Sequence, residues 1–341
     1  MSRFRILFAL AVVAVLATAF VACGGGDSGG SSSEDPQKVL DQTFSPDQQI
    51  ESADIDATLD VNIEGPGQNG SFKADLSGPI DGHGQGFPKF DLTASLSGDA
   101  GGSNIDFEGG ATSTGDAAFV SYKGTDYEVP ASIFSYVTNA YTAGQQQQSQ
   151  QSQQQTLPQL KESLTNVTNE GTEDVDGTET VHVSGDIDVN KLVDVVSKFA
   201  QQAQGLGTFG GASALPSPQE LDQLKQLVTG ASFDVFSGAD DHILRRLDFN
   251  LELQEPGGSG KATFALSLTL GSVNEPQTVE APSNPKPLQD LLNQLGIGDL
   301  GSLGLGSLGG ASGAGGSAGS SGQVQCLQQA QTQQELQQCL Q

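Results

Sequence analysis

An alternation of apolar and polar residues with a period of two runs through much of this chain and strongly limits how it can fold. Apolar residues at Ile55, Ala57, Leu59, Val61 and Ile63 alternate with acidic or polar residues. Because successive side chains of a β-strand point to opposite faces, this pattern predicts a strand with one apolar and one acidic face. The same alternation recurs at residues 72–76, 90–96, 105–107, 181–187, 233–235, 247–253 and 264–270.

Breaks rich in glycine separate the first of these segments, at residues 65–70, 82–86 and 98–102. Their spacing is typical of hairpins, so the neighbouring strands are predicted to pair antiparallel. A Lys123-Gly124 turn joins two further short strands, at 119–122 and 127–129. A last short strand is predicted at 279–282.

Few segments show helical patterns. Asp35-Pro36 is typical of a helix start, with Pro in the first helical position. Further helices are predicted within 132–164, where a Gln/Ser-rich loop at 144–156 interrupts the pattern, and at 189–199, 217–228 and 288–295. Many one-faced strands and few helices favour an α+β domain over residues 35–295. We expect a curved antiparallel β-sheet with helices packed on its concave face.

The N-terminus predicts export. Arg3 and Arg5 precede an apolar stretch at residues 6–20 that has the length of a signal peptide. Phe20-Val21-Ala22-Cys23 resembles the lipobox of bacterial lipoproteins, with Phe20 standing where Leu is usual. We therefore expect residues 1–22 to be a signal peptide, Cys23 to be acylated, and residues 23–34 to be a flexible tether. The protein would then be lipid-anchored on the extracytoplasmic face of the cell membrane. An ordinary secretory signal cleaved near Ala22 is the alternative, and it leaves Cys23 as an exposed thiol.

The chain has two other cysteines, Cys326 and Cys339. On one unbroken helix they would lie about 20 Å apart, beyond disulfide reach. A capping-box pattern at Thr332–Glu335 indicates a second helix start between them. Residues 323–341 are therefore predicted to form a short helical hairpin held by a Cys326–Cys339 disulfide, after a Gly/Ser-rich linker at residues 296–322. A Gly-x-Gly-x-x-Gly match at residues 304–309 lies inside this linker and is rejected as a product of composition.

The charge of the chain excludes some partners. There are 41 acidic and 14 basic residues, a formal net charge of −27. Such a chain repels the phosphates of nucleic acids, and it avoids anionic membrane surfaces unless it is covalently tethered.

No catalytic or metal-binding pattern stands out. The chain has three histidines, His83, His182 and His242, which are expected to be scattered over the surface. It lacks both Gly-x-Ser-x-Gly and His-Glu-x-x-His. Asp174, Asp176 and Gly177 match only a fragment of a calcium loop. We therefore predict no catalytic residues, no metal site and no cofactor, and a protein that is not an enzyme.

Three stretches carry a family resemblance, at residues 115–124, at residues 173–177 with 181–185, and at residues 242–247. Together with the order of lipobox, tether, strands, helical middle and strands, they resemble the LppX/LprG-type actinobacterial lipoproteins. The fold of that family is similar to the lipoprotein carriers LolA and LolB. The resemblance covers about residues 36–290. The Gln-rich tract and the tail after residue 296 depart from the family pattern.

The resemblance implies an incomplete β-barrel whose concave side holds an apolar cavity, plugged by helices. Members of the family bind acylated lipids or lipoproteins there and move them through the envelope. Candidate lining residues in this chain are Phe72, Phe90, Leu92, Phe107, Phe119, Phe249, Leu251, Phe264 and Leu266. We expect a monomer that binds a lipid or lipidated ligand. The alternative from another class is an envelope scaffold or interaction lipoprotein with a solid core and no ligand, since both need the same strand pattern.

Overall fold

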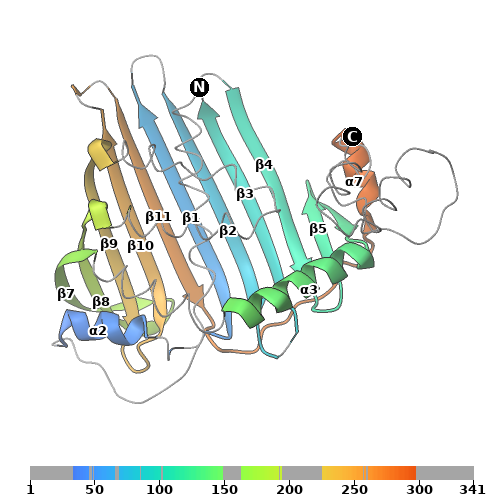
Figure 1. Cartoon of the computed structure of the whole chain (residues 1–341), viewed down its shortest axis with the longest axis horizontal. Helices are drawn as coiled ribbons and strands as arrows, with labels where there is room; N and C mark the ends of the chain where they lie inside the picture. The colour runs from blue at the N-terminus through green and yellow to red at the C-terminus, as the bar shows by residue number, and fades with distance from the viewer. Residues whose placement is uncertain are drawn as a thin grey trace, which may run out of the picture. The chain divides into compact units, whose positions relative to one another are not determined.

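The architecture is one large open sheet with a few helices, seen in a computed structural model of the chain (Figure 1). The structure describes residues 34–148, 163–193 and 225–296, apart from positions 46, 47, 49, 66–68, 85, 101, 102, 192, 256 and 259. Twelve strands form the sheet in the order β12-β6-β5-β4-β3-β2-β1-β11-β10-β9-β8-β7. The chain thus begins in the middle of the sheet, builds one half outward to β6, and builds the other half inward from the β7 edge.

The strands are β1 Ser52–Glu64, β2 Gly70–Asp81, β3 Lys89–Ala100, β4 Ser103–Ser113, β5 Ala118–Tyr122, β6 Thr125–Glu128, β7 Leu164–Val175, β8 Thr178–Ile187, β9 Val228–Gly238, β10 Leu244–Gln254, β11 Lys261–Gly271 and β12 Lys286–Pro287. The helices with described bounds are α2 Pro36–Thr43, α3 Ala131–Gln148 and α7 Leu288–Gln294.

All neighbouring strands pair antiparallel except the two-residue β12, which runs parallel to β6. The two ends of the sheet, β7 and β12, do not pair with each other, so the sheet curves without closing. The predicted α+β class, with a curved antiparallel sheet that forms an incomplete barrel, is therefore confirmed.

Strand register collects the apolar residues on one face. Leu59 of β1 lies opposite Leu266 of β11, which in turn lies opposite Phe249 of β10. Residues between them in sequence, such as Asp60 and Asp248, belong to the other face. We call these the apolar face and the polar face of the sheet.

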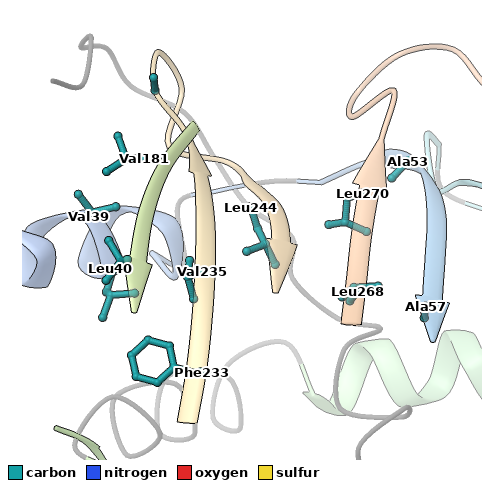
Figure 2. Close-up of a cluster of buried hydrophobic side chains, with 12 residues drawn as sticks. Val39, Leu40, Ala53, Ala57, Val181, Phe233, Val235, Leu244, Leu268 and Leu270 are labelled. Carbon is teal, nitrogen blue, oxygen red and sulfur yellow. The ribbon is translucent and has the colours of Figure 1, made fainter. Parts of the chain in front are cut away.

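Helix α2 covers the apolar face at the β7 end of the sheet. Asp35 caps it, because the Asp35 carboxylate accepts from the backbone N–H of Gln37 and of Lys38. Val39 and Leu40 are fully buried and pack in one cluster with valines of β8 and β9 (Figure 2). Burial of this helix face is what fixes α2 to the sheet.

Helices α3 and α7 pack near the other half. Phe134 of α3 contacts Phe87, in the loop between β2 and β3, edge to face with ring centroids 5.5 Å apart. Leu291 and Leu292 of α7 are buried, and Gln294 accepts a hydrogen bond from the Tyr127 hydroxyl of β6. Helices α2 and α7 thus contact the sheet near its two edges, and α3 contacts the loop between β2 and β3.

The structure corrects several local predictions. Residues 164–175 form strand β7, where the sequence predicted only the end of a helical segment. Val228 begins strand β9 rather than ending a helix. The short strand predicted at 279–282 is absent from that described segment, and residues 286–287 pair instead. Helix α3 continues through Gln148, so residues 144–148 of the predicted loop are helical.

Other predictions lie outside the described residues. These are the signal peptide with Cys23 and most of the tether, the rest of the Gln/Ser-rich loop, most of the helices at 189–199 and 217–228, and the linker and hairpin with Cys326 and Cys339. Among the helices that are described, none has the length and apolar character needed to cross a membrane.

Candidate functional site

Eight of the nine predicted lining residues share the apolar face. Phe72 lies opposite Val61, and Leu251 lies opposite Phe264 on neighbouring strands. Phe107 lies opposite Leu96, and Phe90 opposite Ile80. The register therefore brings the eight onto one continuous surface that runs from β10 to β4. They are Phe72, Phe90, Leu92, Phe107, Phe249, Leu251, Phe264 and Leu266.

Phe119 is the exception. It lies opposite Thr112, whose hydroxyl donates to the carboxylate of Asp91 on the polar face. Phe119 is therefore on the polar face, although it is buried. Its neighbours Ala118 and Val120 occupy the apolar face instead.

The apolar face is closed over β10 and β11. Leu251, Phe264 and Leu266 are each at most 7% exposed and form one buried cluster with Leu59 and Val61 of β1. Side chains packed this tightly leave little room for a ligand. This part of the face, over β1, β10 and β11, behaves as an ordinary core, and we call it the closed half of the sheet.

The apolar face is more open over β2, β3 and β4. Phe72, Phe90 and Leu92 are only half-buried, and Phe107 is 43% exposed. Large apolar side chains that remain in contact with water on neighbouring strands mark a candidate binding surface. We call the apolar face of β2–β5 the open half of the sheet.

Glycines lie beneath two rings of the open half. A Cβ atom built on Gly98 would lie 2.7 Å from Cδ1 of Phe72, and one built on Gly109 would lie 2.8 Å from Cζ of Phe107. Both rings therefore lie against the sheet, where a larger residue would push them away. The ring of Tyr122 lies 6.0 Å from that of Phe107 and extends the surface to β5. Tyr122 was not among the predicted lining residues. It lies two residues after the apolar Val120, and this spacing could have placed it on the same face of the strand.

An aromatic cluster borders the open half at one end of the strands. The ring centroid of Phe87 lies 6.2 Å from that of Phe90, 5.5 Å from that of Phe134 and 5.2 Å from that of Tyr141. The cluster joins the β2–β3 loop to helix α3. Phe87 follows a glycine-rich break and lies outside every predicted strand, so no periodic pattern indicated it.

The polar face is rich in carboxylates, and one of them is locally neutralised. Lys73 donates to Asp75, and the hydroxyl groups of Thr58 and Ser95 donate to the same carboxylate. The hydrogen bond from Lys73 and those from the hydroxyls lower the pKa of Asp75, and partial burial opposes them. The same contact raises the pKa of Lys73.

Two of the histidines lie between carboxylates. His83 contacts Asp81 at 2.7 Å and Glu51 at 3.1 Å, and His182 contacts Asp234 at 2.9 Å and Glu173 at 3.7 Å. In a Ser-His-Asp arrangement one ring nitrogen faces a hydroxyl nucleophile. In His83 and His182 both nitrogens face acids, so neither has that geometry.

The third histidine corrects a prediction. His242 was expected at the surface, but it is 2% exposed and neither of its ring nitrogens has a hydrogen-bond partner. Its backbone φ is +53°, in the turn between β9 and β10. This turn folds the side chain inward.

The described residues hold no cluster of three or more His, Cys, Asp or Glu side chains suited to a metal ion. The fragment of a calcium loop forms the turn between β7 and β8. There, the backbone N–H of Gly177 donates to the Asp174 carboxylate.

Comparison with known proteins gives structural matches only. No known family model and no curated protein sequence matches the chain. Among solved structures, the chain is similar to LprF from Mycobacterium bovis, with 16% identity over 75% of this chain and 100% of that one and a TM-score of 0.36. It is also similar to the lipoprotein LppX from Mycobacterium tuberculosis, with 17% identity over 72% of this chain and 98% of that one and a TM-score of 0.30.

A protein of the DUF1329 family from Desulfovibrio piger matches with 9% identity over 69% of this chain and 90% of that one, and a TM-score of 0.16.

Proposed function

We propose that this protein is a membrane-anchored lipoprotein of the cell envelope that binds a lipid or a lipidated molecule on the open half of its sheet. The observation that carries the proposal is the contrast along one face. Phe264 is 6% exposed, whereas Phe107, on the same face, is 43% exposed. Apolar surface left in water costs about 25 cal/mol per Å². An acyl chain laid along β2–β5 would remove that cost, at about 0.8 kcal/mol for each buried CH₂ group.

The ligand would lie on the side chains that the open half presents. Phe72, Phe90, Leu92 and Phe107 would form the surface, with Tyr122 at its β5 border. The glycines under Phe72 and Phe107 keep these rings close to the sheet. Phe249, Leu251, Phe264 and Leu266 would support this surface from the closed half.

We further propose an acylated anchor at the N-terminus and a disulfide-bonded tail. Residues 1–22 would be removed as a signal peptide, Cys23 would carry acyl chains, and residues 23–34 would link the lipid to the domain on the extracytoplasmic side. After the 296–322 linker, Cys326 and Cys339 would form a disulfide in that oxidising compartment. The protein would act as a monomeric carrier, moving its ligand across the envelope without catalysis.

Native mass spectrometry of the mature chain, residues 23–341, tests the proposal. We expect a stoichiometric adduct that is lost on denaturation and that identifies the ligand class. Phe107→Glu places a charge on the open half and should remove the adduct. Thr93→Glu is the matched control, because Thr93 is exposed on the polar face of neighbouring β3 and should leave the adduct in place.

A scaffold lipoprotein with a solid core is the second candidate, and the two buried clusters on the apolar face favour it. It predicts a chain with no adduct, unchanged after incubation with envelope lipids. It also predicts binding to other envelope components that survives without lipid and is lost on deletion of residues 296–341. Those results together would replace the carrier proposal.

A further inference from the structure

Helix α3 carries no charge, in a chain whose net charge is −27. No charged residue stands between Glu128 and Lys161. Of the three helices whose bounds are described, α2 contains Lys38 and Asp41 and α7 contains Asp290. A surface helix in a protein this acidic would ordinarily carry charges on its outward side.

The hydroxyl groups of α3 are satisfied within the helix. Ser135 donates to the carbonyl of Ala131 at 2.7 Å, and Thr138 donates to the carbonyl of Ser135 at 3.1 Å. Thr142 donates to the carbonyl of Thr138 at 2.9 Å. A hydroxyl whose hydrogen is already bonded to the helix loses less when water leaves it. The helix is therefore less polar than its Ser and Thr content suggests.

The two sides of α3 have different neighbours. Phe134 is buried and Tyr141 is half-buried, and both contact Phe87 at the border of the open half. Tyr136 is 37% exposed, and Ser135 and Asn139 are exposed beside it. We call the side with Ser135, Tyr136 and Asn139 the outer side of α3. Tyrosine is enriched where proteins meet the headgroup region of a bilayer.

The point at which the tether reaches the domain is fixed. The carbonyl of Glu34 accepts from the side-chain amide of Asn169 in β7, and its carboxylate pairs with Lys38 at 2.7 Å. Residues 24–34 can span at most about 40 Å between Cys23 and this point. A domain held so close to a bilayer meets it at a high effective concentration, so a weakly binding surface is enough to orient it.

Helices α2 and α3 lie at the same end of the strands. The buried cluster that contains Val39 and Leu40 of α2 extends to Ala53 at the start of β1. Phe87, whose ring contacts Phe134 of α3, lies in the loop between β2 and β3, and Phe90 beside it lies at the start of β3. Ala53 and Phe90 both lie opposite Ile80. Figure 1 shows both helices along this end of the sheet.

We propose that the outer side of α3 docks on the uncharged headgroup region of the bilayer that holds the acylated Cys23. The rest of the chain is too acidic to approach anionic lipid, so a neutral, zwitterionic surface is the fitting partner. Docking would place the Phe87 cluster and the open half next to the membrane, giving a lipid a path onto the sheet. This inference rests on the proposed anchor and ligand-binding function.

The absence of tryptophan from the chain gives a clean test. Tyr136→Trp introduces a single fluorescent reporter on the outer side of α3. Asn104→Trp is the matched control, since Asn104 is exposed at the opposite end of the strands, in β4. Each acylated mature variant is reconstituted in phosphatidylcholine vesicles with and without brominated acyl chains. We expect brominated lipid to quench the Tyr136→Trp variant about twofold and to leave the Asn104→Trp variant nearly unchanged.

A second change checks that the contact is specific. Adding Asn139→Glu to the Tyr136→Trp variant places a charge on the outer side and should abolish most of the quenching, with circular dichroism showing an unchanged fold. Equal quenching of both reporters, or none in the Tyr136→Trp variant, would overturn the docking proposal and leave α3 as a surface for a protein partner.

Native mass spectrometry of the same samples reports the lipid adduct separately. An adduct without quenching rejects docking alone, whereas the loss of both rejects the function on which docking rests.

Discussion

The ring of Phe72 covers Gly98, the residue opposite it on the neighbouring strand. A Cβ atom at Gly98 would lie 2.7 Å from Phe72 Cδ1, and still closer to the carbonyl oxygen of Ser71. The approach of the Phe72 ring and the β2 backbone to Gly98 therefore requires a residue without a side chain at this position of β3. This glycine lets the Phe72 ring, one of the largest side chains of the open half, lie against the sheet.

Gly98→Ala should therefore destabilise the fold, by about 1–3 kcal/mol, because the methyl group must displace both the ring and the backbone of β2. Chemical denaturation measures the change. Gly230→Ala on β9 is the matched control, since its Cβ would lie 3.8 Å from the nearest atom, in Glu252. It should be neutral or slightly stabilising. Equal losses in the two variants would mean that contact with Phe72 is not the cause.

The closed and open halves predict different costs for removing a phenylalanine. Phe264→Ala should lower the free energy of unfolding by about 3–5 kcal/mol, because it leaves a cavity in a buried cluster. Phe107→Ala should cost about 1 kcal/mol or less, because much of the ring is already in water. Denaturant titrations of the two lipid-free variants provide the comparison. A similar large loss for both would show that the whole apolar face is a solid core.

The sheet could be predicted wherever one face of a strand is buried. The alternation in β1, β10 and β11 identified each strand, and the apolar residues found there do line up across the register. Strand β7 was missed because it lies at an edge and its pairing with β8 is irregular at two places. An irregular pairing interrupts the period of two, and an edge strand needs little apolar character.

The candidate site could be predicted only in part, because the period-two pattern does not resolve every position. Phe119 and Val120 are adjacent and both apolar, so periodicity could not tell which of them belongs to the apolar face of the sheet. The burial of His242 depends on its own positive φ in the turn, a conformation that the sequence would indicate only if a glycine stood there. The difference between the open and closed halves depends on what packs above each strand, which local sequence does not specify.

The pair formed by Lys73 and Asp75 predicts a measurable pH effect. The pKa of Asp75 is lowered in the folded state, mainly by the hydrogen bond from Lys73. The ionised pair therefore stabilises the fold above the unfolded-state pKa, about 3.9, and this contribution is lost as the pH falls through the folded-state value. Lys73→Met should raise the pKa of Asp75, measured by NMR titration of the carboxyl carbon.

Thr58 and Ser95 still donate to Asp75 in that variant, so they should limit the rise in its pKa. Lys261→Met is the control, because Lys261 pairs loosely with Glu252 at 3.8 Å. It should leave the titration of Asp75 unchanged. An equal rise in both variants would point to the general loss of positive charge.

The hydroxyl groups of Thr43 and Ser237, 2.7 Å apart and both buried, join α2 to β9. Thr43→Val should cost about 1–3 kcal/mol, because it leaves the Ser237 hydroxyl buried without a partner. Ser237→Ala should cost less, since Thr43 can still donate to the carbonyl of Val39. The double variant should be more stable than the sum of the single losses predicts, because no orphaned hydroxyl remains. Additive losses in the denaturation cycle would show that this contact does not hold α2 on the sheet.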